Sequence, residues 1–577
     1  DYNRSSAKDY EFKWRHLPKS RGGKQFSSDV NIATSTYTSN NSYNVEDYTR
    51  NSMNSYISYS APIKKTPFRY SLNARHDQTN STGAYNFSLP NGNISMSRVY
   101  PLKNVIKGKK TAGNDFLKTL GFSYKFDFDN KLTNQYNAPT SAYPIAYNGE
   151  IITPKDTVLE LNEYGIEQMW DNKRIGMRHT IPISGTYKVG QALNINPSMT
   201  YTENWFLENN EYSQTQINGK EAIAVDTVKK FSRVSAVTTN VTMSARAYGY
   251  YGIKGTKSMI RHTLVPTIGF RYNPDYSRNE KTIDEVVIDG ETEYLNRYQN
   301  AIYKPSTSQQ QTAMTFKLTN AIQLKKQLTD TSDKKVNILD NIGMSTSYNF
   351  AADSLQLAPF VLNANTNIFG LVNFQSGMTI EPYITEYNSV TDKHEAMNKL
   401  AWNSGKGIGQ IQRANFSLGT SLNPDKLKGK GNPGEDVGFG TDQEFGRDTT
   451  GQRTPDYRQL NQNQYVNFSM PWNLNARYVF NFNNQPNSEK SVTQSLQFGG
   501  DFKVTDKWRL GYAATDDIQA KKFITPSLNV YRDLNCWEMR INWIPFGPRT
   551  SYGFYINIKS NALKELKLSK KNSFYDQ

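Results

Sequence analysis

The chain has 577 residues, of which 36% are hydrophobic and 13% aromatic, and its formal net charge is +16. No run of about 18 apolar residues occurs, and the mean hydropathy is −0.72, which excludes a transmembrane helix. The single cysteine, Cys536, excludes an internal disulfide framework and a cysteine-rich metal site. A polar average with many aromatic residues is instead typical of strands with one face in water and aromatic belts at lipid interfaces.

The positive charge has two readings. It serves solubility alone, or it attracts an anionic partner such as nucleic acid, lipid headgroups or a phosphorylated glycolipid. Nucleic acid is disfavoured because the basic residues are dispersed and form no known binding motif. The densest basic run, KNVIKGKK (Lys103–Lys110), lies between two predicted strands, and we interpret it as a solvated loop.

Two-residue alternation of apolar and polar residues recurs from one end of the chain to the other, which predicts two-faced strands. AYNFSLPNGNISMS (Ala84–Ser97) predicts a hairpin around its Pro-Asn-Gly sequence. Clear single strands are predicted at Leu120–Asn130, Trp472–Asn484 and Trp537–Trp543. The other predicted strands are Phe68–His76, Gly176–Tyr187, Leu193–Tyr201, Val234–Tyr251, Arg261–Tyr272, Thr312–Leu324, Ile342–Phe350, Phe360–Ile368, Asn373–Tyr387, Ala414–Leu422, Tyr465–Pro471, Ser495–Val504 and Trp508–Ala514.

The second face of these strands is polar in strand after strand, whereas a large soluble sandwich needs many strands that are apolar on both faces. This pattern predicts an all-β fold: a large transmembrane antiparallel β-barrel with a wet interior. At roughly 20–25 residues per strand and turn, the chain builds about 24–26 strands. No convincing helix is expected, and LKELKLS (Leu563–Ser569) is a weak late candidate.

Long polar segments separate some of the strands, and we predict that they are extracellular loops, which are the long connections of such barrels. They are Lys131–Ile175, Asn204–Phe231, Asn273–Gln309, Asn388–Gln412 and Asn423–Gln464.

No catalytic or metal site is predicted, and no cofactor. The five histidines have no zinc-site spacing, and there is no nucleophile elbow, Walker sequence or dinucleotide fingerprint. We therefore expect that the protein is not an enzyme.

Several patches in a consistent order resemble one family. They are ISMSRVYPLK (Ile94–Lys103), RHTIPIS (Arg178–Ser184), INPSMTYTENW (Ile195–Trp205), IRHTLVPTIGFRYNPDYS (Ile260–Ser277) and LNCWEMRINWIPFGPRTSYGFYINIK (Leu534–Lys559). Together they resemble the LPS-assembly outer-membrane translocon, the LptD family. The resemblance implies a multi-pass barrel in the outer membrane of a Gram-negative cell envelope, which inserts lipopolysaccharide into the outer leaflet.

In that family, the first and last strands close the barrel at a weak seam that serves as a lateral gate. The resemblance implies four partners: lipopolysaccharide, the outer-membrane bilayer, an LptE-like lipoprotein that plugs the lumen, and the periplasmic Lpt bridge. We expect residues 1–577 to be a single barrel domain, since the family's N-terminal jelly-roll domain is not seen in this sequence.

The family topology puts the first strand near Tyr10–His16 and the last near Ser551–Lys559. Proline cannot donate to a ladder, so a proline after the first strand suits a weak seam, although it also suits an ordinary turn. The expected gate residues are Tyr10, Phe12, Trp14, Pro18, Tyr552, Phe554 and Ile556.

Strand parity predicts a second set of residues, basic side chains that face the lumen. They are Lys125, Arg477, Arg540 and Lys559. They either steer lipid A phosphates and core sugars or simply keep the pore wet. Family members often carry an adjacent cysteine pair that bonds to the N-terminal domain, but here Trp537 follows Cys536. At most one such disulfide is therefore expected, to a segment outside this sequence.

Two alternatives remain open from the sequence. A TonB-dependent nutrient receptor predicts a plug domain before the barrel, and barrel-like strands begin here almost at once. Another large outer-membrane secretion or channel barrel predicts internal repeats or a soluble passenger, and neither is found.

Overall fold

The computed structural model describes residues 10–34, 52–136, 143–427 and 471–572. Short gaps inside these ranges fall at 21, 81, 107–110, 148–149, 153–155, 191, 257, 330–331, 369, 390, 520–521, 524–525, 547–549 and 559–566. None of the helices in these ranges is long and apolar enough to cross a membrane.

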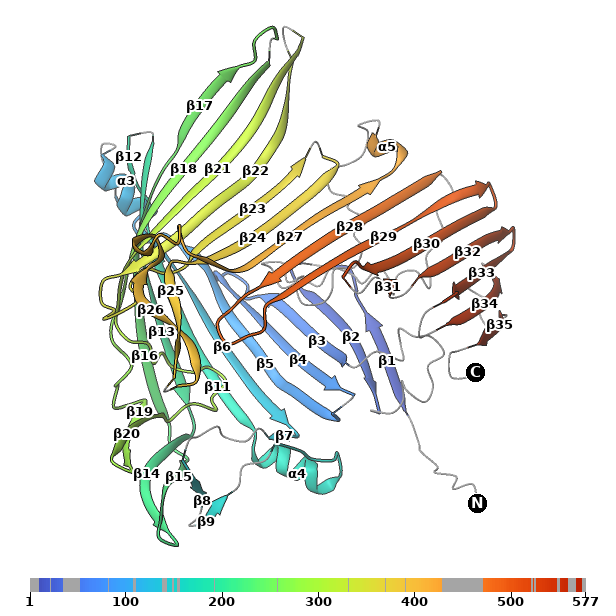
Figure 1. The fold of residues 1–577 in the computed structure, drawn as a ribbon. Coiled ribbons are helices and arrows are strands. Elements are labelled where there is room, and N and C mark those ends of the chain that lie inside the picture. Colours follow the sequence, from blue (N-terminus) through green and yellow to red (C-terminus); the bar gives the residue numbers. More distant parts are fainter. Residues whose placement is uncertain are drawn as a thin grey trace, which may run out of the picture.

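One twisted antiparallel sheet dominates the structure, and its strands follow one another in space in nearly the order of the chain (Figure 1). Its long strands are β1 (Glu11–His16), β2 (Gln25–Ala33), β3 (Ser52–Pro62), β4 (Phe68–Thr79), β5 (Ala84–Val99), β6 (Gly121–Thr133), β11 (Arg174–Ser184), β13 (Leu193–Phe206), β16 (Ser232–Ala245), β18 (Ser258–Asn273), β21 (Gln311–Thr329), β22 (Ser332–Asn349), β23 (Phe360–Ile368), β24 (Val372–Glu381), β27 (Gln410–Leu422), β28 (Trp472–Asn483), β29 (Ser491–Thr505), β30 (Trp508–Asp517), β32 (Ser527–Leu534), β33 (Trp537–Ile544), β34 (Ser551–Ile558) and β35 (Lys567–Asn572).

Three short strands complete the sheet: β12 (Tyr187–Val189), β17 (Ala247–Gly252) and β31 (Lys522–Phe523). Each pairs with the same neighbour as the long strand beside it in the chain, so each continues that strand after a break. Across the described residues the 25 strands therefore occupy 22 successive positions, which confirms the prediction of a very large antiparallel sheet, with slightly fewer positions than the predicted 24–26 strands.

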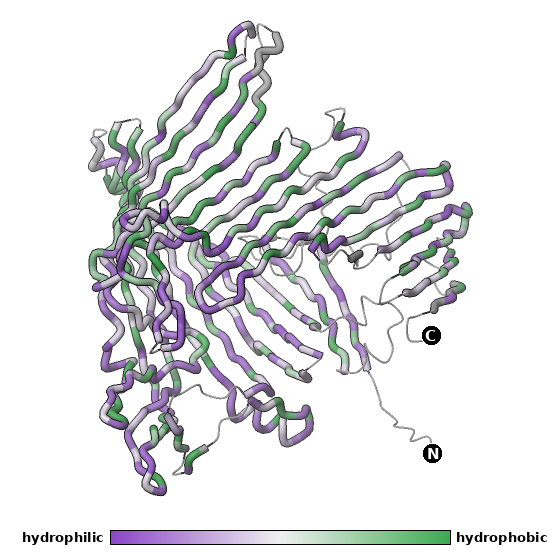
Figure 2. The backbone as a smooth tube through the Cα atoms, viewed as in Figure 1, coloured by the Kyte–Doolittle hydropathy of each residue, from purple (hydrophilic) through white to green (hydrophobic). Residues whose placement is uncertain are grey.

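Most strands of the sheet have one largely polar and one largely apolar face, and each face continues from strand to strand across the sheet. Direct cross-strand partners share a face. At the first strands Arg15 lies opposite Asp29, and at the last strands Arg540 lies opposite Tyr531. When the opposite residue is followed from each strand to the next across the sheet, Arg15, Lys125, Arg477 and Arg540 all lie on one polar face. The alternation appears as regularly changing colour along the strands in Figure 2.

The two ends of the sheet differ in the length of their connections. At the short-turn end, most connections are tight, such as 253–257 between β17 and β18. At the long-loop end lie the connections 134–173, 207–231, 274–310 and 382–409. Four of the five predicted extracellular loops therefore share one end, in agreement with the prediction.

The fifth predicted loop, Asn423–Gln464, was assigned to the wrong end. β27 ends and β28 begins at the short-turn end, so this long connection starts and finishes at that end. Most of the segment lies outside the described residues, but α5 (Pro424–Leu427) is described at its start. The sequence identifies a long connection, whereas the end at which it lies depends on how many strands precede it.

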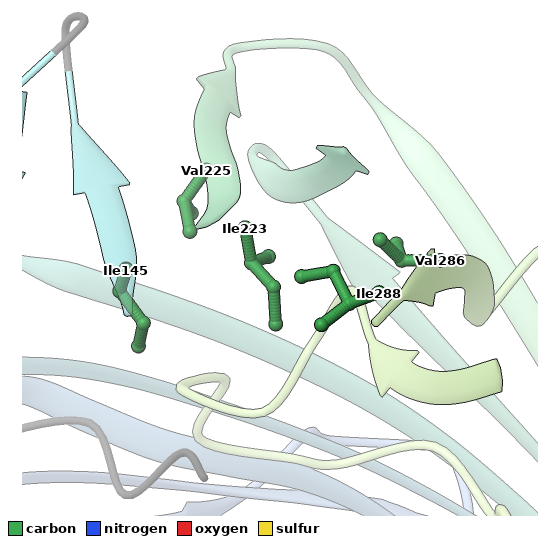
Figure 3. Close-up of a cluster of buried hydrophobic side chains, with 5 residues drawn as sticks. All are labelled: Ile145, Ile223, Val225, Val286 and Ile288. Carbon is green, nitrogen blue, oxygen red and sulfur yellow. The ribbon is translucent and has the colours of Figure 1, made fainter. Parts of the chain in front are cut away.

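Three of the long loops fold together into a small cap. Here β14 (Asn209–Ile217), β15 (Lys220–Val228), β8 (Ile145–Tyr147) and β9 (Glu150–Ile152) form one sheet, and β19 (Ile283–Ile288) pairs with β20 (Glu291–Asn296). Their buried apolar residues meet in one cluster (Figure 3). Its members are Ile145, Ile223, Val225, Val286 and Ile288. The long loops at this end thus have a core of their own.

The remaining elements are small. β7 (Gln135–Tyr136) pairs with β10 (Thr157–Val158), and β25 (Tyr383–Asn388) pairs with β26 (Lys393–Leu400), which leads into η1 (Ala401–Ser404). Two helices were not expected from the sequence: α3 (Ala112–Thr119) at the short-turn end and α4 (Glu163–Asp171) at the long-loop end. Each begins at a capping residue, Thr111 or Asn162, whose side chain accepts a backbone hydrogen bond.

Two further predictions, a hairpin and a helix, were wrong. Ala84–Ser97 is not a hairpin but part of the single strand β5, and its ladders shift register around Leu89 and Pro90. A proline has no N–H for a ladder, and a bulge accommodates it as well as a turn does. The weak helix candidate Leu563–Ser569 is also wrong where it is described, because Lys567 begins β35.

The cap cluster gives a stability prediction. Ile288 is fully buried, whereas its neighbour Val287 is 50% exposed. We expect Ile288→Ala to destabilise the cap by about 2–5 kcal/mol, because it leaves a cavity among packed side chains. The measurement is hydrogen exchange of the β14 and β15 amides, with Val287→Ala as the matched control. Equal effects of the two substitutions would contradict the proposed cap core.

Candidate functional site

The sheet has two edges, β1 and β35, and each of these strands pairs with one neighbour among the described residues. The outer N–H and C=O groups of an edge strand are available to a further strand or to a ligand. On β1, the apolar face is well exposed: Phe12 is 60% and Trp14 42% exposed. Trp14 stacks parallel to His16 with ring centroids 6.4 Å apart.

The expected gate residues of the first strand lie at this edge. Phe12 and Trp14 belong to β1, Tyr10 directly precedes it, and Pro18 lies exposed in the turn that follows. The backbone N–H of Tyr10 donates to the Thr34 hydroxyl, 3.3 Å away, which holds the start of β1 against the end of β2.

The expected last strand is not the outermost one. Tyr552, Phe554 and Ile556 lie on β34, which pairs with β33 on one side and with β35 on the other. The edge is formed by β35, where Leu568 lies opposite Ile556 and is 62% exposed. The alternation in KLSKKN is too short and too rich in lysine to be recognised as a strand from the sequence.

Three of the four expected lumen-facing basic residues lie on the polar face. The Lys125 ammonium group is 2.7 Å from Asp127, and the Arg540 guanidinium group is 3.0 Å from Glu538. Arg477 lies between Gly419 and Gln497 on the neighbouring strands. Lys559 lies outside the described residues. Carboxylates on the same face therefore balance part of the basic charge.

A polar cleft of ≈ 420 Å³ opens on this face near the long-loop end. Its charged lining combines three cationic and two anionic side chains from β4, β6 and β11: Arg75, Lys131, Arg174, Asp77 and Asp129. Within it, the Arg75 guanidinium group donates two hydrogen bonds to Asp77, at 2.7 and 2.9 Å. Mixed charges of this kind suit a ligand that is rich in hydroxyl and phosphate groups.

A segment of one long loop, Tyr298–Lys304, folds back over the polar face beside this cleft; we call it the strap. Tyr298 stacks on Phe206 with centroids 4.0 Å apart, and its hydroxyl lies 2.9 Å from that of Ser232. Phe206 and Val234 are apolar residues on the otherwise polar face, and they form a small buried cluster with Tyr298. This cluster anchors the strap to the sheet.

Polar contacts hold the rest of the strap. Arg174 donates to the Asn300 carbonyl at 3.3 Å, and the Asn204 amide donates to the Lys304 carbonyl at 3.3 Å. The Arg178 guanidinium group lies 4.4 Å above the Tyr303 ring, a cation–π contact. Sequence reasoning missed the strap, and the only signal for it is the pair of tyrosines in a polar loop.

Burial raises the pKa of Tyr303 to about 12, and the negative charges of Asp127 and Asp129 act in the same direction. The neutral phenol is therefore the form that packs against the sheet.

Cys536 is exposed in the tight turn between β32 and β33, at the short-turn end. The turn is made by Asn535, whose positive φ of 68° is tolerated by asparagine. No disulfide partner is present for it among the described residues.

Together, these features describe a two-faced sheet with a charged, hydrated surface, an apolar surface and two edges. The family model described as LptD protein matches residues 1–383. The chain is a member of the LptD family. LptD proteins are outer-membrane β-barrel transport proteins that handle lipopolysaccharide, which confirms the resemblance seen in the sequence. The matched region ends at the first residue of β25.

Comparison with solved structures adds little to the LptD assignment. A mutant of the ferric enterobactin receptor PfeA from Pseudomonas aeruginosa is 10% identical, with a TM-score of 0.30 over 91% of this chain and 72% of that chain. The siderophore receptor PirA from Acinetobacter baumannii is 10% identical, with a TM-score of 0.30 over 90% and 70% of the two chains. A TM-score of 0.30 is too low to support a conclusion about fold or function. No curated protein matches the chain.

The strap gives a pH prediction. The pKa of Tyr303 is raised above the ordinary value near 10, so its contribution to strap packing is complete below about pH 10. It is lost as the pH rises through about 12. A spin label at Asn300→Cys in a Cys536→Ser background should become mobile across that range, as measured by electron paramagnetic resonance.

The matched control for this experiment is the same labelled protein with Tyr303→Phe. Phenylalanine keeps the ring and cannot ionise, so its strap should stay immobile where the wild-type strap is released. Release of both straps at the same pH would show that Tyr303 ionisation is not the cause.

Proposed function

We propose that this LptD protein inserts lipopolysaccharide into the outer leaflet through a lateral seam between the first and last strands of one barrel domain formed by residues 1–577. The observation that carries the proposal is the pair of strand edges at which a continuous polar face and a continuous apolar face end together. An amphiphile with sugars on one side of the wall and acyl chains on the other can leave sideways only at such an edge.

Backbone hydrogen bonding explains why the seam belongs at the edges. Two adjacent interior strands are joined by a ladder whose bonds each contribute about 0.5–1.5 kcal/mol net, and more where lipid replaces water. Among the described residues, strand β1 pairs with β2 alone, and it presents Phe12 and Trp14 to the surroundings. A contact between β1 and β35 that closes the barrel would therefore be the one suited to opening.

The polar face supplies the route for the sugars in this proposal. Lys125, Arg477 and Arg540 lie on it, and the mixed-charge cleft lies near its long-loop end. Charged donors and acceptors exchange hydrogen bonds with phosphates and hydroxyl groups without holding them tightly. The acyl chains would follow the apolar face, with Phe554 and Ile556 next to the seam.

The partners in this proposal are an LptE-like lipoprotein plug on the polar side and the periplasmic Lpt bridge that delivers the lipid. Cys536 is the attachment point for a disulfide to a cysteine outside this sequence, and its exposure at the short-turn end is compatible with that role. If long loops are extracellular, as in other barrels, that end faces the periplasm.

Site-specific photo-crosslinking in cells tests the seam. A benzophenone amino acid at Phe12 in β1 or Leu568 in β35 should form adducts with lipopolysaccharide, and weaker adducts are expected at Phe554. The matched control is Phe270, which is 45% exposed on the same apolar face in the interior strand β18. Ordinary contact with the membrane gives equal labelling at all positions.

Enrichment at the two edge strands over Phe270 is the expected result. Equal labelling, or no adduct at any position in a correctly folded barrel, would contradict lateral release. It would leave a receptor or secretion channel as the better reading.

A further inference from the structure

The short-turn end of the first half of the sheet is strongly basic, and Asp115 of α3 is the one acidic residue in the sequence of its connections 17–24, 63–67, 100–120 and 253–257. The stretches 17–24, 63–67 and 253–257 connect successive strands at this end, and 100–106 begins the connection 100–120 from β5 to β6. Each of these four stretches contains lysine and no aspartate or glutamate. The exposed lysines are Lys19, Lys24, Lys64, Lys65, Lys103 and Lys254. We call these six residues the basic collar.

Each of these stretches also exposes a large apolar side chain next to its lysines. The exposed fractions range from 37% for Ile253 to 71% for Val105. The others are Leu17, Ile63 and Tyr100. Apolar side chains next to flexible lysines are typical of a membrane interface, where the apolar group enters the acyl boundary and the ammonium group reaches the headgroups.

The charge does not follow from a general excess of lysine. At the opposite end, connection 134–173 holds six acidic residues and two lysines. Connection 274–310 holds seven acidic residues and four basic ones. Among the described side chains, none of the collar ammonium groups has an ion-pair partner, whereas Lys503 in the second half of the sheet is 2.6 Å from Asp506.

We propose that the basic collar binds the phosphates of anionic phospholipids in the leaflet that surrounds the short-turn end. The occupant follows from charge complementarity and from position: the lysines lie at the ends of strands whose apolar face meets lipid. This inference goes beyond the proposed transport function, since it concerns the resident bilayer and only the first half of the sheet.

The expected strength follows from ordinary surface electrostatics. A lysine near an anionic membrane surface gives roughly a fivefold preference for the charged lipid, and the effect fades within about 10 Å at 0.1 M salt. Only part of the first lipid shell lies at the collar, so the average preference of the whole shell is smaller than the local one.

Lipid selectivity measured by electron paramagnetic resonance tests the collar. The full chain is placed in phosphatidylcholine nanodiscs with trace spin-labelled phosphatidylglycerol or phosphatidylcholine, and the motionally restricted fraction of each label is compared. Wild-type protein should prefer phosphatidylglycerol. At low salt this preference should be at least about threefold smaller in a variant with four collar lysines replaced, Lys19→Gln, Lys64→Gln, Lys65→Gln and Lys254→Gln.

Two control variants separate the collar from general effects. Replacing four exposed lysines of the long-loop end, Lys281, Lys393, Lys399 and Lys406, by glutamine removes the same charge and should leave the preference unchanged. Replacing the four collar lysines by arginine should keep the preference, which shows that the barrel tolerates substitution at these positions.

Three outcomes would overturn the proposal. The collar glutamine variant could keep the wild-type preference, or the long-loop control could lose as much as the collar variant. In the third, the preference for phosphatidylglycerol stays while the variant retains less purified lipopolysaccharide, which would assign the lysines to the glycolipid instead.

Discussion

The structure depends on one constraint, that residues directly opposite each other in a β-ladder lie on the same face. Once the register of one strand is set, this constraint fixes the faces of every strand paired with it. Here it extends from Arg15 at the first edge to Arg540 near the last, across strands far apart in the sequence. A register slip of one residue anywhere would turn lysines and aspartates toward lipid.

The same constraint explains where function can be located. In the interior of the sheet, both sides of every strand are paired and the two faces are kept apart. At β1 and β35 the separation ends, so these edges are the places where an amphiphilic lipid can pass with its sugars and its acyl chains in suitable surroundings. The strap and the cap modify the polar face near one end, and the basic collar marks the other end.

Period-two alternation was enough to predict the fold class, most strands and the faces of Lys125, Arg477 and Arg540. The errors came from features that alternation does not encode. Pro90 disturbs the pattern in the same way whether it makes a turn or a bulge, so β5 was split into a hairpin. The short strand β35 was not recognised, which moved the expected edge to β34.

The end at which a connection lies depends on whether an odd or even number of strands precedes it. Length alone does not fix this, and for Asn423–Gln464 the assignment from length gave the wrong end. The strap could not be predicted because its contacts join Tyr298 to Phe206 and Arg178 to Tyr303, residues that are distant in the chain. Such contacts depend on the three-dimensional arrangement and leave no periodic signal.

The central claim is that lipopolysaccharide leaves between the first and last strands, and locking that seam tests it most directly. Cysteine pairs are placed with one member in β1 and one in β35, and a pair that forms a disulfide on oxidation is selected. The control pair joins Ala476 and Phe498, which face each other in the interior ladder between β28 and β29. The arrival of newly made lipopolysaccharide at the cell surface is then followed by pulse-chase. Seam oxidation should stop it, reduction should restore it, and the control disulfide should have no effect. Continued arrival with the seam fully locked would contradict lateral release.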